Sequence, residues 1–228
     1  MPRCVSLPIV LKIGGSLVFP GKTNTGYIKE VSSILLNLKK RTVVGVVVGM
    51  GKRGEKALLA ARKKRVSEYD LDAVAIRQTR KNALLLRKAL GLRGKVPETI
   101  DEARREAKRK GITVVGGTVP GHTTNTVAAL LAEALGAKKL VNATNVDGVY
   151  TKDPRKHKTA RKFRKMKFAK LIALSAEQDA RGARTHFVFD LLAAKLIARS
   201  NIRTYIINGT PEEIQSTLKG KTHGTVVG

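Results

Sequence analysis

Cysteine and tryptophan are nearly absent from this chain of 228 residues, which holds one cysteine, Cys4, and no tryptophan. A single cysteine cannot form an internal disulfide or build a zinc site of several cysteines, and it is typical of proteins from a reducing compartment. No apolar run approaches the roughly 18 residues that a membrane-spanning helix needs. The first ten residues also lack the pattern of a secretory signal. We therefore expect a cytoplasmic protein.

Acidic side chains are also few: 17 Asp and Glu stand against 45 Lys and Arg, for a formal net charge of +28. Ion-pair networks need acids, so they cannot account for this excess. The segment 152–170 is the most basic, with ten Lys and Arg and one acid. Such a charge attracts polyanions, and it favours RNA or a ribonucleoprotein as a partner. A basic composition without any specific partner explains the charge as well.

Aromatic residues are scarce, with five Phe and four Tyr. A platform of aromatic side chains that stacks on bases is therefore not expected. Binding to a nucleic-acid backbone needs no aromatic residue, so an RNA partner would be held through its phosphates.

Short apolar runs alternate with segments of helical periodicity along the chain. The predicted strands are 9–13, 43–48, 112–115, 139–143 and 202–207. The predicted helices are 27–40, 55–66, 73–90, 97–110, 123–135, 187–199 and 212–218. This alternation predicts an α/β fold with a mainly parallel sheet.

Three of the predicted strands end in glycine, at Gly14-Gly15-Ser16, Gly49-Met50-Gly51 and Gly116-Gly117-Thr118. Ligands of open α/β sheets bind outside the carboxyl ends of the strands. Glycine there lets the backbone approach a phosphate, and the following helix offers free N–H groups. One such junction is usually a tight turn, but three in one chain favour a ligand that carries phosphate.

Residues 49–54 spell G-x-G-x-x-G, which raises the possibility of a dinucleotide site. That site needs a second strand ending in an acid about 20 residues later. The stretch 55–72 is instead polar and helical in pattern, so we disfavour this reading.

Lys12 interrupts the apolar strand 9–13, next to the first glycines. On an edge strand it would simply face solvent. Beside a phosphate loop its charge would stabilise a transferring phosphoryl group, and its position favours that role.

Three motifs resemble those of the amino acid kinase family, and most closely its archaeal-type uridylate (UMP) kinase branch. They are Lys12-Ile-Gly-Gly-Ser16, Gly116-Gly-Thr-Val-Pro-Gly-His-Thr-Thr124 and Thr144-Asn-Val-Asp-Gly-Val-Tyr-Thr-Lys-Asp-Pro154. The resemblance runs from about residue 9 to 227. It implies a single domain over 1–228, a three-layer αβα sandwich whose mainly parallel sheet has about eight strands. The N-terminal half would hold UMP and the C-terminal half ATP.

The same resemblance implies transfer of the γ-phosphate of ATP to UMP, with Mg²⁺ as the metal ion, in a homo-oligomer that is usually a hexamer. It assigns Lys12 to catalysis, and Gly15, Ser16 and Gly51 to the ATP phosphates. It assigns Thr144, Tyr150 and Asp153 to the ATP nucleoside. On the acceptor side it implies that UMP is held by Met50, Asp72, Thr118, Val119, Pro120, Gly121, His122, Thr123 and Thr124. Asp72 would bind the ribose in that arrangement.

Three positions depart from the family pattern. Met50 replaces the middle glycine of the second loop, where its side chain could crowd the UMP phosphate. Glu55 stands where the family often has arginine, and Asn125 where it commonly has aspartate. We therefore keep a second hypothesis, a kinase-like protein of weak or lost catalysis that binds RNA or a ribonucleoprotein.

A third hypothesis is a kinase of the same fold for another small molecule, since fold alone does not determine substrate. Isopentenyl phosphate kinases usually carry a histidine in the acceptor loop. No histidine occurs between residues 49 and 72, which argues against that acceptor.

Overall fold

The computed structural model describes residues 6–152, 154, 157–179 and 189–228. Their strands form one seven-stranded sheet of order β3-β2-β1-β4-β6-β7-β5. The strands are β1 (Ser6–Ile13), β2 (Thr42–Val48), β3 (Ile112–Val115), β4 (Lys139–Thr144), β5 (Lys165–Met166), β6 (Arg203–Asn208) and β7 (Thr225–Val227). Strands β3, β2, β1, β4 and β6 are parallel, β7 is antiparallel to β6, and β5 is parallel to β7.

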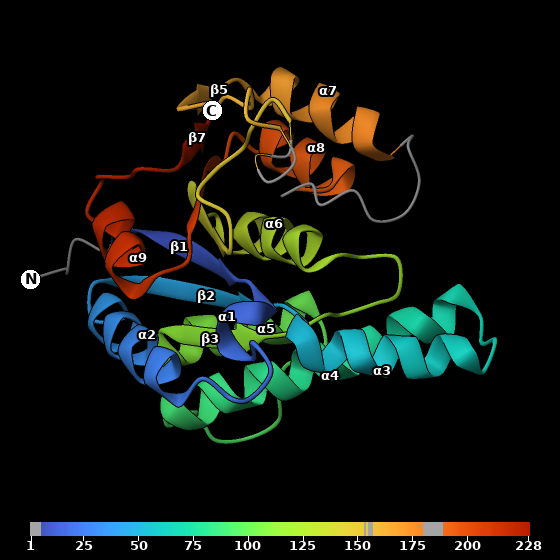
Figure 1. The fold of residues 1–228 in the computed structure, drawn as a ribbon. Coiled ribbons are helices and arrows are strands. Elements are labelled where there is room, and N and C mark those ends of the chain that lie inside the picture. Colours follow the sequence, from blue (N-terminus) through green and yellow to red (C-terminus); the bar gives the residue numbers. More distant parts are fainter. Residues whose placement is uncertain (1–5, 153, 155–156, 180–188) are drawn as a thin grey trace, which may run out of the picture.

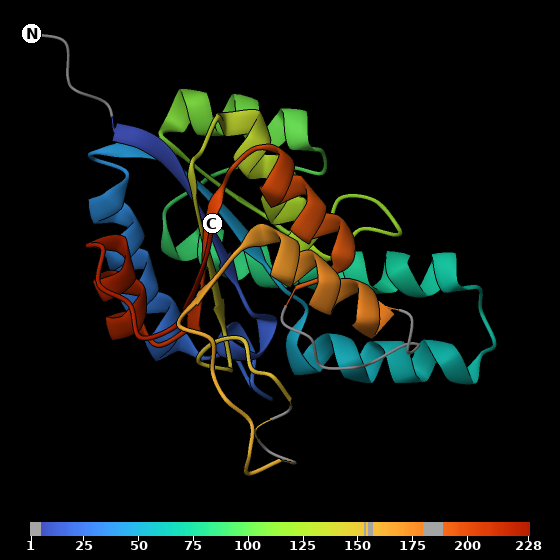
Figure 2. The same cartoon turned by 90° about the horizontal axis from the view of Figure 1, so that it is seen from above.

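Helices pack on both faces of the sheet (Figure 1). They are α1 (Gly15–Val18), α2 (Thr25–Leu38), α3 (Gly51–Lys63), α4 (Glu68–Ala89), α5 (Ile100–Lys110), α6 (Thr124–Leu135), α7 (Phe168–Asp179), α8 (Leu191–Arg199) and α9 (Pro211–Leu218). Figure 2 shows α3 and α4 extending side by side away from the sheet. No helix within the described part of the chain is long and apolar enough to cross a membrane.

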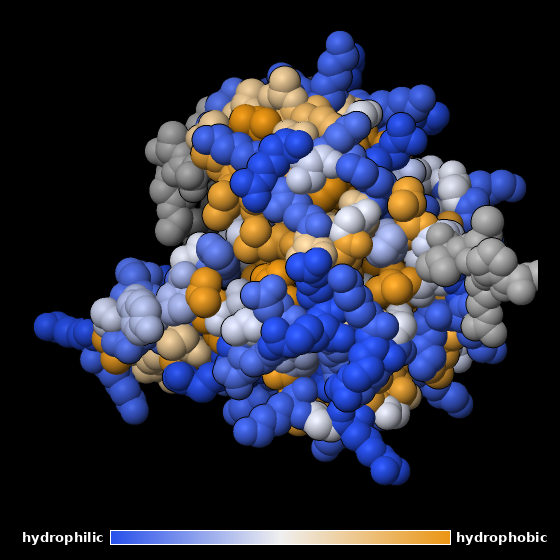
Figure 3. Space-filling model, turned by 180° about the vertical axis from the view of Figure 1, so that it is seen from behind, coloured by the Kyte–Doolittle hydropathy of each residue, from blue (hydrophilic) through white to orange (hydrophobic). Residues whose placement is uncertain are grey.

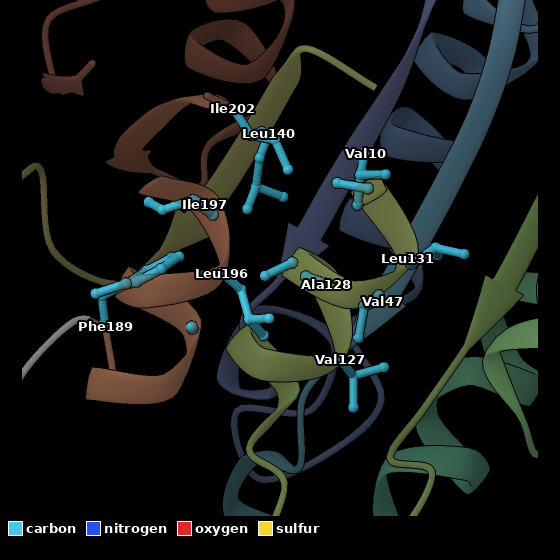
Figure 4. Close-up of a cluster of buried hydrophobic side chains, with 14 of the residues drawn as sticks. Val10, Val47, Val127, Ala128, Leu131, Leu140, Phe189, Leu196, Ile197 and Ile202 are labelled. Carbon is cyan, nitrogen blue, oxygen red and sulfur yellow. The ribbon is translucent and has the colours of Figure 1, made fainter. Parts of the chain in front are cut away.

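Each face of the sheet has its own hydrophobic core. One cluster joins Val10, Val47 and Leu140 of the sheet to side chains of α5, α6, α7 and α8 (Figure 4). The other cluster joins Leu11 and Val46 to α1, α2, α4 and α9. Consecutive residues of β1 thus enter opposite cores, which explains why the parallel strands read as continuous apolar runs rather than as alternating patterns.

The outer surface of the helices is polar. Figure 3 shows a rear face that is mostly hydrophilic, with hydrophobic residues scattered across it. On α5 the residues Arg104, Arg105, Lys108 and Arg109 are all exposed, while Ala103 and Ala107 of the same helix are fully buried. The helix therefore divides into an apolar face and a basic face, as the spacing of its residues dictates.

The structure confirms the α/β fold with a mainly parallel sheet. Each of the five predicted strands is present, and its ends differ from the expected ones by at most three residues. Four elements escape the sequence patterns: α1, α7, and the short strands β5 and β7. The stretch 55–72 contains parts of α3 and α4 and no strand, as expected.

Two helices begin later than the pattern suggests. The helix expected from residue 97 begins at Ile100, because Thr99 caps it by accepting a hydrogen bond from the Glu102 N–H. The helix expected from residue 187 begins at Leu191, after the capping residue Asp190. Residues 187 and 188 of that prediction lie outside the described residues.

A buried ion pair ties α4 to α5. The guanidinium of Arg87, 1% exposed, donates to both carboxylate oxygens of Glu106 at 2.7 and 2.9 Å. Lys110 Nζ and Thr113 Oγ1 donate to the same carboxylate. Burial would raise the pKa of Glu106, but these donors outweigh it and lower the pKa to about 2. The Glu106 carboxylate therefore stays ionised, and both of its oxygen atoms accept hydrogen bonds.

We expect Glu106→Gln to lower the free energy of unfolding near neutral pH by about 3–5 kcal/mol, because it leaves the Arg87 charge buried without its partner. Glu30→Gln, on the exposed side of α2, is the control and should change the stability by less than about 0.5 kcal/mol. Urea unfolding of the three proteins measures the difference.

Acid should remove this contribution. The pKa of Glu106 lies lower in the folded protein than its ordinary 4.5, so the pair stabilises the fold fully above that value and loses its effect as the pH falls toward about 2. The gap between wild type and Glu106→Gln should accordingly narrow through this window. A gap that stays constant between neutral pH and pH about 3 would contradict the assignment.

Candidate active site

The carboxyl ends of the five parallel strands lie at one edge of the sheet. The glycine-containing segments that follow β1, β2, β3 and β6 therefore meet there, together with the Thr144–Tyr150 segment after β4. β1 lies between β2 and β4, so the chain connections diverge on either side of it. Ligands of open α/β sheets bind at such a point.

The first two glycine loops are in direct backbone contact. A Cβ atom on Gly15 would overlap backbone atoms of Gly49, Met50 and Gly51. Gly51 also has a φ of +68°, in the left-handed region that glycine adopts at low cost. The two loops can approach this closely because Gly15, Gly49 and Gly51 carry no side chain.

Asn82 of α4 holds the second loop in place. Its side chain is fully buried, and Nδ2 donates to the carbonyl oxygens of Gly49 at 3.0 Å and of Met50 at 2.7 Å. Both carbonyl groups are thereby directed at the helix. One amide side chain thus fixes the loop that follows β2.

Lys12 lies on the central strand β1, with Val47 of β2 and Asn142 of β4 as its neighbours in register. The alternative of an edge-strand lysine facing solvent is therefore wrong, because β1 is flanked on both sides. Burial lowers the pKa of Lys12 to about 8, and the negative charge of Asp190 opposes this decrease. Lys12 lies two residues before Gly14 of the first glycine loop, on the same face of β1 as Val10, which packs in the core shared with α6.

Asp190 links three parts of the site. It caps α8 by accepting from the Ala193 N–H at 2.9 Å. Its two carboxylate oxygens also accept from Thr123 Oγ1 at 2.6 Å and Thr126 Oγ1 at 2.7 Å. The carboxylate thus ties the starts of α6 and α8 together, close enough to Lys12 to raise its pKa.

A cavity of about 230 Å³ opens beside these loops on the acceptor side. It is lined by Met50, Asp72, Ala75, Ile76, Thr79, Gly117, Gly121, His122, Thr123 and Thr124. Six of the nine residues predicted for UMP are therefore brought together here. The other three, Thr118, Val119 and Pro120, belong to the same loop but do not line the cavity.

The loop after β3, residues 116–123, is held by α4. Asp72 Oδ2 accepts from the Gly121 N–H at 2.7 Å, and Arg80 donates to the carbonyl oxygens of Gly117 and Thr118, both at 3.1 Å. Nδ1 of His122 is buried and has no hydrogen-bond partner within the described part of the chain. An unsatisfied ring nitrogen beside a cavity is a natural contact for a ligand.

The start of α6 adds positive character to this cavity. Thr123 caps the helix, with Oγ1 accepting from the N–H groups of Asn125 and Thr126, both at 3.1 Å. The N-terminal end of a helix carries a partial positive charge and attracts anions. A phosphate in the cavity would therefore lie near this end of α6, since Thr123 and Thr124 line the cavity.

On the predicted donor side, Gly15 and Gly51 are in contact and Ser16 follows in α1. Thr144 ends β4 next to them, since its neighbour Ala143 accepts from the Gly14 N–H at 2.8 Å. Asp153 lies outside the described residues, so its predicted contact stays a prediction.

Tyr150 takes part in a small polar cluster. Its hydroxyl donates to Asp147 Oδ1 at 2.8 Å, and Lys162 Nζ contacts Asp147 Oδ2 at 2.7 Å. Burial and the neighbouring Asp147 both raise the pKa of Tyr150, so its hydroxyl stays protonated. The cluster stabilises the segment that follows β4.

The sequence reading missed Asp190, Asn82 and Arg80. Each acts on a residue far away in the chain, and none belongs to a glycine motif. An Asp directly before an apolar helical repeat was a usable indication of a cap, but it does not predict contact with Lys12. The exposed Glu55 lies on α3, four residues after Gly51, and no described ion pair involves it.

Comparisons with known proteins agree with this geometry. A model of the amino acid kinase family matches residues 8–208. The uridylate kinase of Archaeoglobus fulgidus is 40% identical over 222 residues, which cover 97% of this chain and 100% of that protein. The uridylate kinase of Methanocaldococcus jannaschii is 41% identical over 223 residues, covering 96% of this chain and 98% of that protein.

Solved structures show the same relation. The crystal structure of the Archaeoglobus fulgidus uridylate kinase superposes with a TM-score of 0.84 at 41% identity and covers 96% of this chain and 99% of that one. A UMP kinase from Ureaplasma parvum, 22% identical, superposes with a TM-score of 0.78 over 97% of this chain and 98% of that one, and so shares the fold. The family model spans most of the chain, and relatives near 40% identity align along almost all of it: the chain belongs to the amino acid kinase family.

Proposed function

We propose that this protein is an ATP-dependent uridylate kinase, which transfers the γ-phosphate of ATP to UMP and releases ADP and UDP. The observation that carries the proposal is the contact between the first glycine loop, which follows the strand that holds Lys12, and the second glycine loop. Met50 of the second loop, Asp72 and the loop after β3 line one cavity beside this contact. Full-length similarity to uridylate kinases at about 40% identity supports the same acceptor.

The reaction needs no general base from the protein. The nucleophile is an oxygen of the UMP phosphate, which is already anionic near neutral pH because its second pKa is about 6. Transfer then depends on alignment of the two phosphates and on neutralisation of their charge. A site without a histidine or free carboxylate at the reacting atoms is consistent with this chemistry.

Each residue has a definable task in that scheme. Lys12 places a positive charge where the phosphoryl group crosses between the two substrates. Loop N–H groups around Gly15 and Gly51 would hold ATP, and the start of α6 would hold the UMP phosphate. Asp190 is a positioning residue, because its oxygens are engaged by Thr123, Thr126 and Ala193.

Mg²⁺ fits this site as an ion that arrives with ATP. No cluster of three or more His, Cys, Asp or Glu side chains suited to a metal occurs among the residues that the structure describes. Mg²⁺ commonly binds through substrate phosphates, waters and one or two carboxylates, so a dedicated protein cage is not required. When bound, it would neutralise part of the phosphate charge.

The direct test is an ADP-release assay with UMP, CMP, isopentenyl phosphate, glutamate and aspartate as acceptors. UMP should give the highest kcat/KM, on the order of 10⁵ M⁻¹s⁻¹. Asp72→Asn should raise the KM for UMP by about tenfold and leave the KM for ATP unchanged, since it removes a charged acceptor for the ribose hydroxyls. Asp101→Asn, exposed on α5, is the control. A preference for another acceptor would refute the assignment.

Lys12→Ala should lower kcat by roughly 100-fold or more and change the KM for ATP little, because the contact strengthens in the transition state. Lys12→Arg keeps the charge with a different geometry and should lose less activity. Stopped assays at saturating substrates measure both. Equal kcat values for wild type and Lys12→Ala would remove Lys12 from catalysis.

The activity should also fall in alkali. The ammonium form of Lys12 is needed, and its pKa near 8 means that kcat/KM for ATP declines above about pH 8. Asp190→Asn removes the charge that holds this pKa up, so the decline should begin at lower pH. In Lys12→Arg the guanidinium stays charged and the decline should move to higher pH.

RNA binding stays an untested alternative. None of the relatives named above is described as an RNA-binding protein. Arg164, Lys165 and Arg203 are exposed around a cavity of about 610 Å³, which is the surface that such a partner would use. The hexamer implied by the family resemblance likewise stays a prediction.

If RNA binds through backbone phosphates, affinity should fall roughly 10³-fold or more between about 50 and 200 mM salt. Replacement of Arg164, Lys165, Lys167 and Lys170 by glutamine should flatten that dependence while UMP kinase activity is kept. Lys162 is left unchanged because it pairs with Asp147. Weak RNA binding that does not depend on salt would mean that the net positive charge reflects a basic composition and not an RNA partner.

A further inference from the structure

The Met50 side chain fills the space beside Gly54 at the start of α3. Met50 precedes the helix as its capping residue, and Gly54 lies one turn further on and is buried. A Cβ atom on Gly54 would overlap Cγ of Met50 and lie 2.5 Å from its Sδ. The thioether side chain of Met50 therefore takes up the space that a side chain at position 54 would need.

Alanine would normally be the better residue at position 54. Gly54 is in the interior of a helix and its φ is not positive, so its backbone needs no glycine. Glycine weakens a helix interior relative to alanine because it loses more conformational freedom on folding. The contact with Met50 is what an alanine there would disturb.

The backbone of Met50 cannot move to relieve such a clash. Its carbonyl oxygen accepts from Asn82, and the next residue, Gly51, is packed against Gly15. A methyl group at position 54 would force the Met50 side chain to rotate away, and would still lie 3.2 Å from the Met50 Cβ, a tight contact. Methionine is unbranched and rotates easily, and this side chain already lines the acceptor cavity beside Asp72 and Thr79.

We propose that Met50 and Gly54 act as a pair that sets the width of the acceptor cavity, with Gly54 providing the space that keeps the Met50 thioether out of the path of a nucleoside monophosphate. The pair is thus a specificity-determining element for the acceptor. This inference rests on the proposed uridylate kinase function. It also explains how a methionine is tolerated where the family pattern has a glycine.

The test is a double-mutant cycle on UMP binding and turnover. Gly54→Ala alone should raise the KM and the dissociation constant for UMP by on the order of tenfold, with the KM for ATP little changed. Adding Met50→Ala to Gly54→Ala should recover most of the lost affinity. Gly26→Ala is the matched control, since Gly26 is also a helical glycine and a Cβ there would meet one atom, 3.9 Å away. It should leave UMP binding unchanged.

The melting temperature provides a second test, because the effect of Gly54→Ala on it should depend on the residue at position 50. Gly54→Ala should raise the melting temperature in a Met50→Gly background, where both the thioether and the Cβ that lies 3.2 Å away are removed, because the helix gains a better residue. With Met50 present, the same change should leave the melting temperature unchanged or lower it. An increase of equal size in both backgrounds would overturn the proposed contact.

The outcomes separate this inference from the proposed function. If the wild-type protein neither binds nor phosphorylates UMP, the function itself is wrong. If the wild type uses UMP and Gly54→Ala does so with the same KM, the function stands and the pair has no role. Failure of Met50→Ala to rescue Gly54→Ala would likewise overturn the pair.

Discussion

The site depends on one close contact, in which the backbone after β1 touches the backbone after β2. It exists because Gly15, Gly49 and Gly51 have no side chains, and it brings together the two loops that we propose bind phosphate. Asn82 then fixes the second loop from behind by taking two of its carbonyl groups. Any β-carbon at Gly15 would separate the loops, and the donor and acceptor phosphates would no longer be aligned.

Charge is balanced locally around this contact, although the chain as a whole is strongly basic. Lys12 is only partly exposed on its central strand, and burial lowers its pKa to about 8 because an ammonium charge costs free energy away from water. Asp190 offsets part of that cost and also joins α6 to α8 through Thr123 and Thr126. The same carboxylate therefore tunes the lysine and positions the end of the helix that faces the acceptor. Electrostatics and architecture are coupled in a single side chain.

Much of the fold could be predicted because its patterns are local. The parallel strands are apolar runs with glycine at their ends, and the helices have regular apolar spacing, so the α/β alternation was readable without any tertiary information. The elements that escaped were the four-residue helix α1, the helix α7, which follows a basic segment, and the strands β5 and β7, which are two and three residues long. Strands that short are stabilised by their neighbours in the sheet rather than by their own residues, so no local pattern reveals them.

The sequence by itself determined which loops can come close to another backbone or to a ligand, because glycine leaves space for that approach. It also determined that Lys12 stands beside the first loop. Tertiary structure decided that β1 is a central strand, so that Lys12 is enclosed and not on an open edge. It also decided that Asp190 reaches Thr123, and that the Met50 side chain lies over Gly54 while lining the cavity beside Asp72. These contacts join side chains whose separation and direction are set by how the helices pack on the sheet, and that packing is a property of the whole chain.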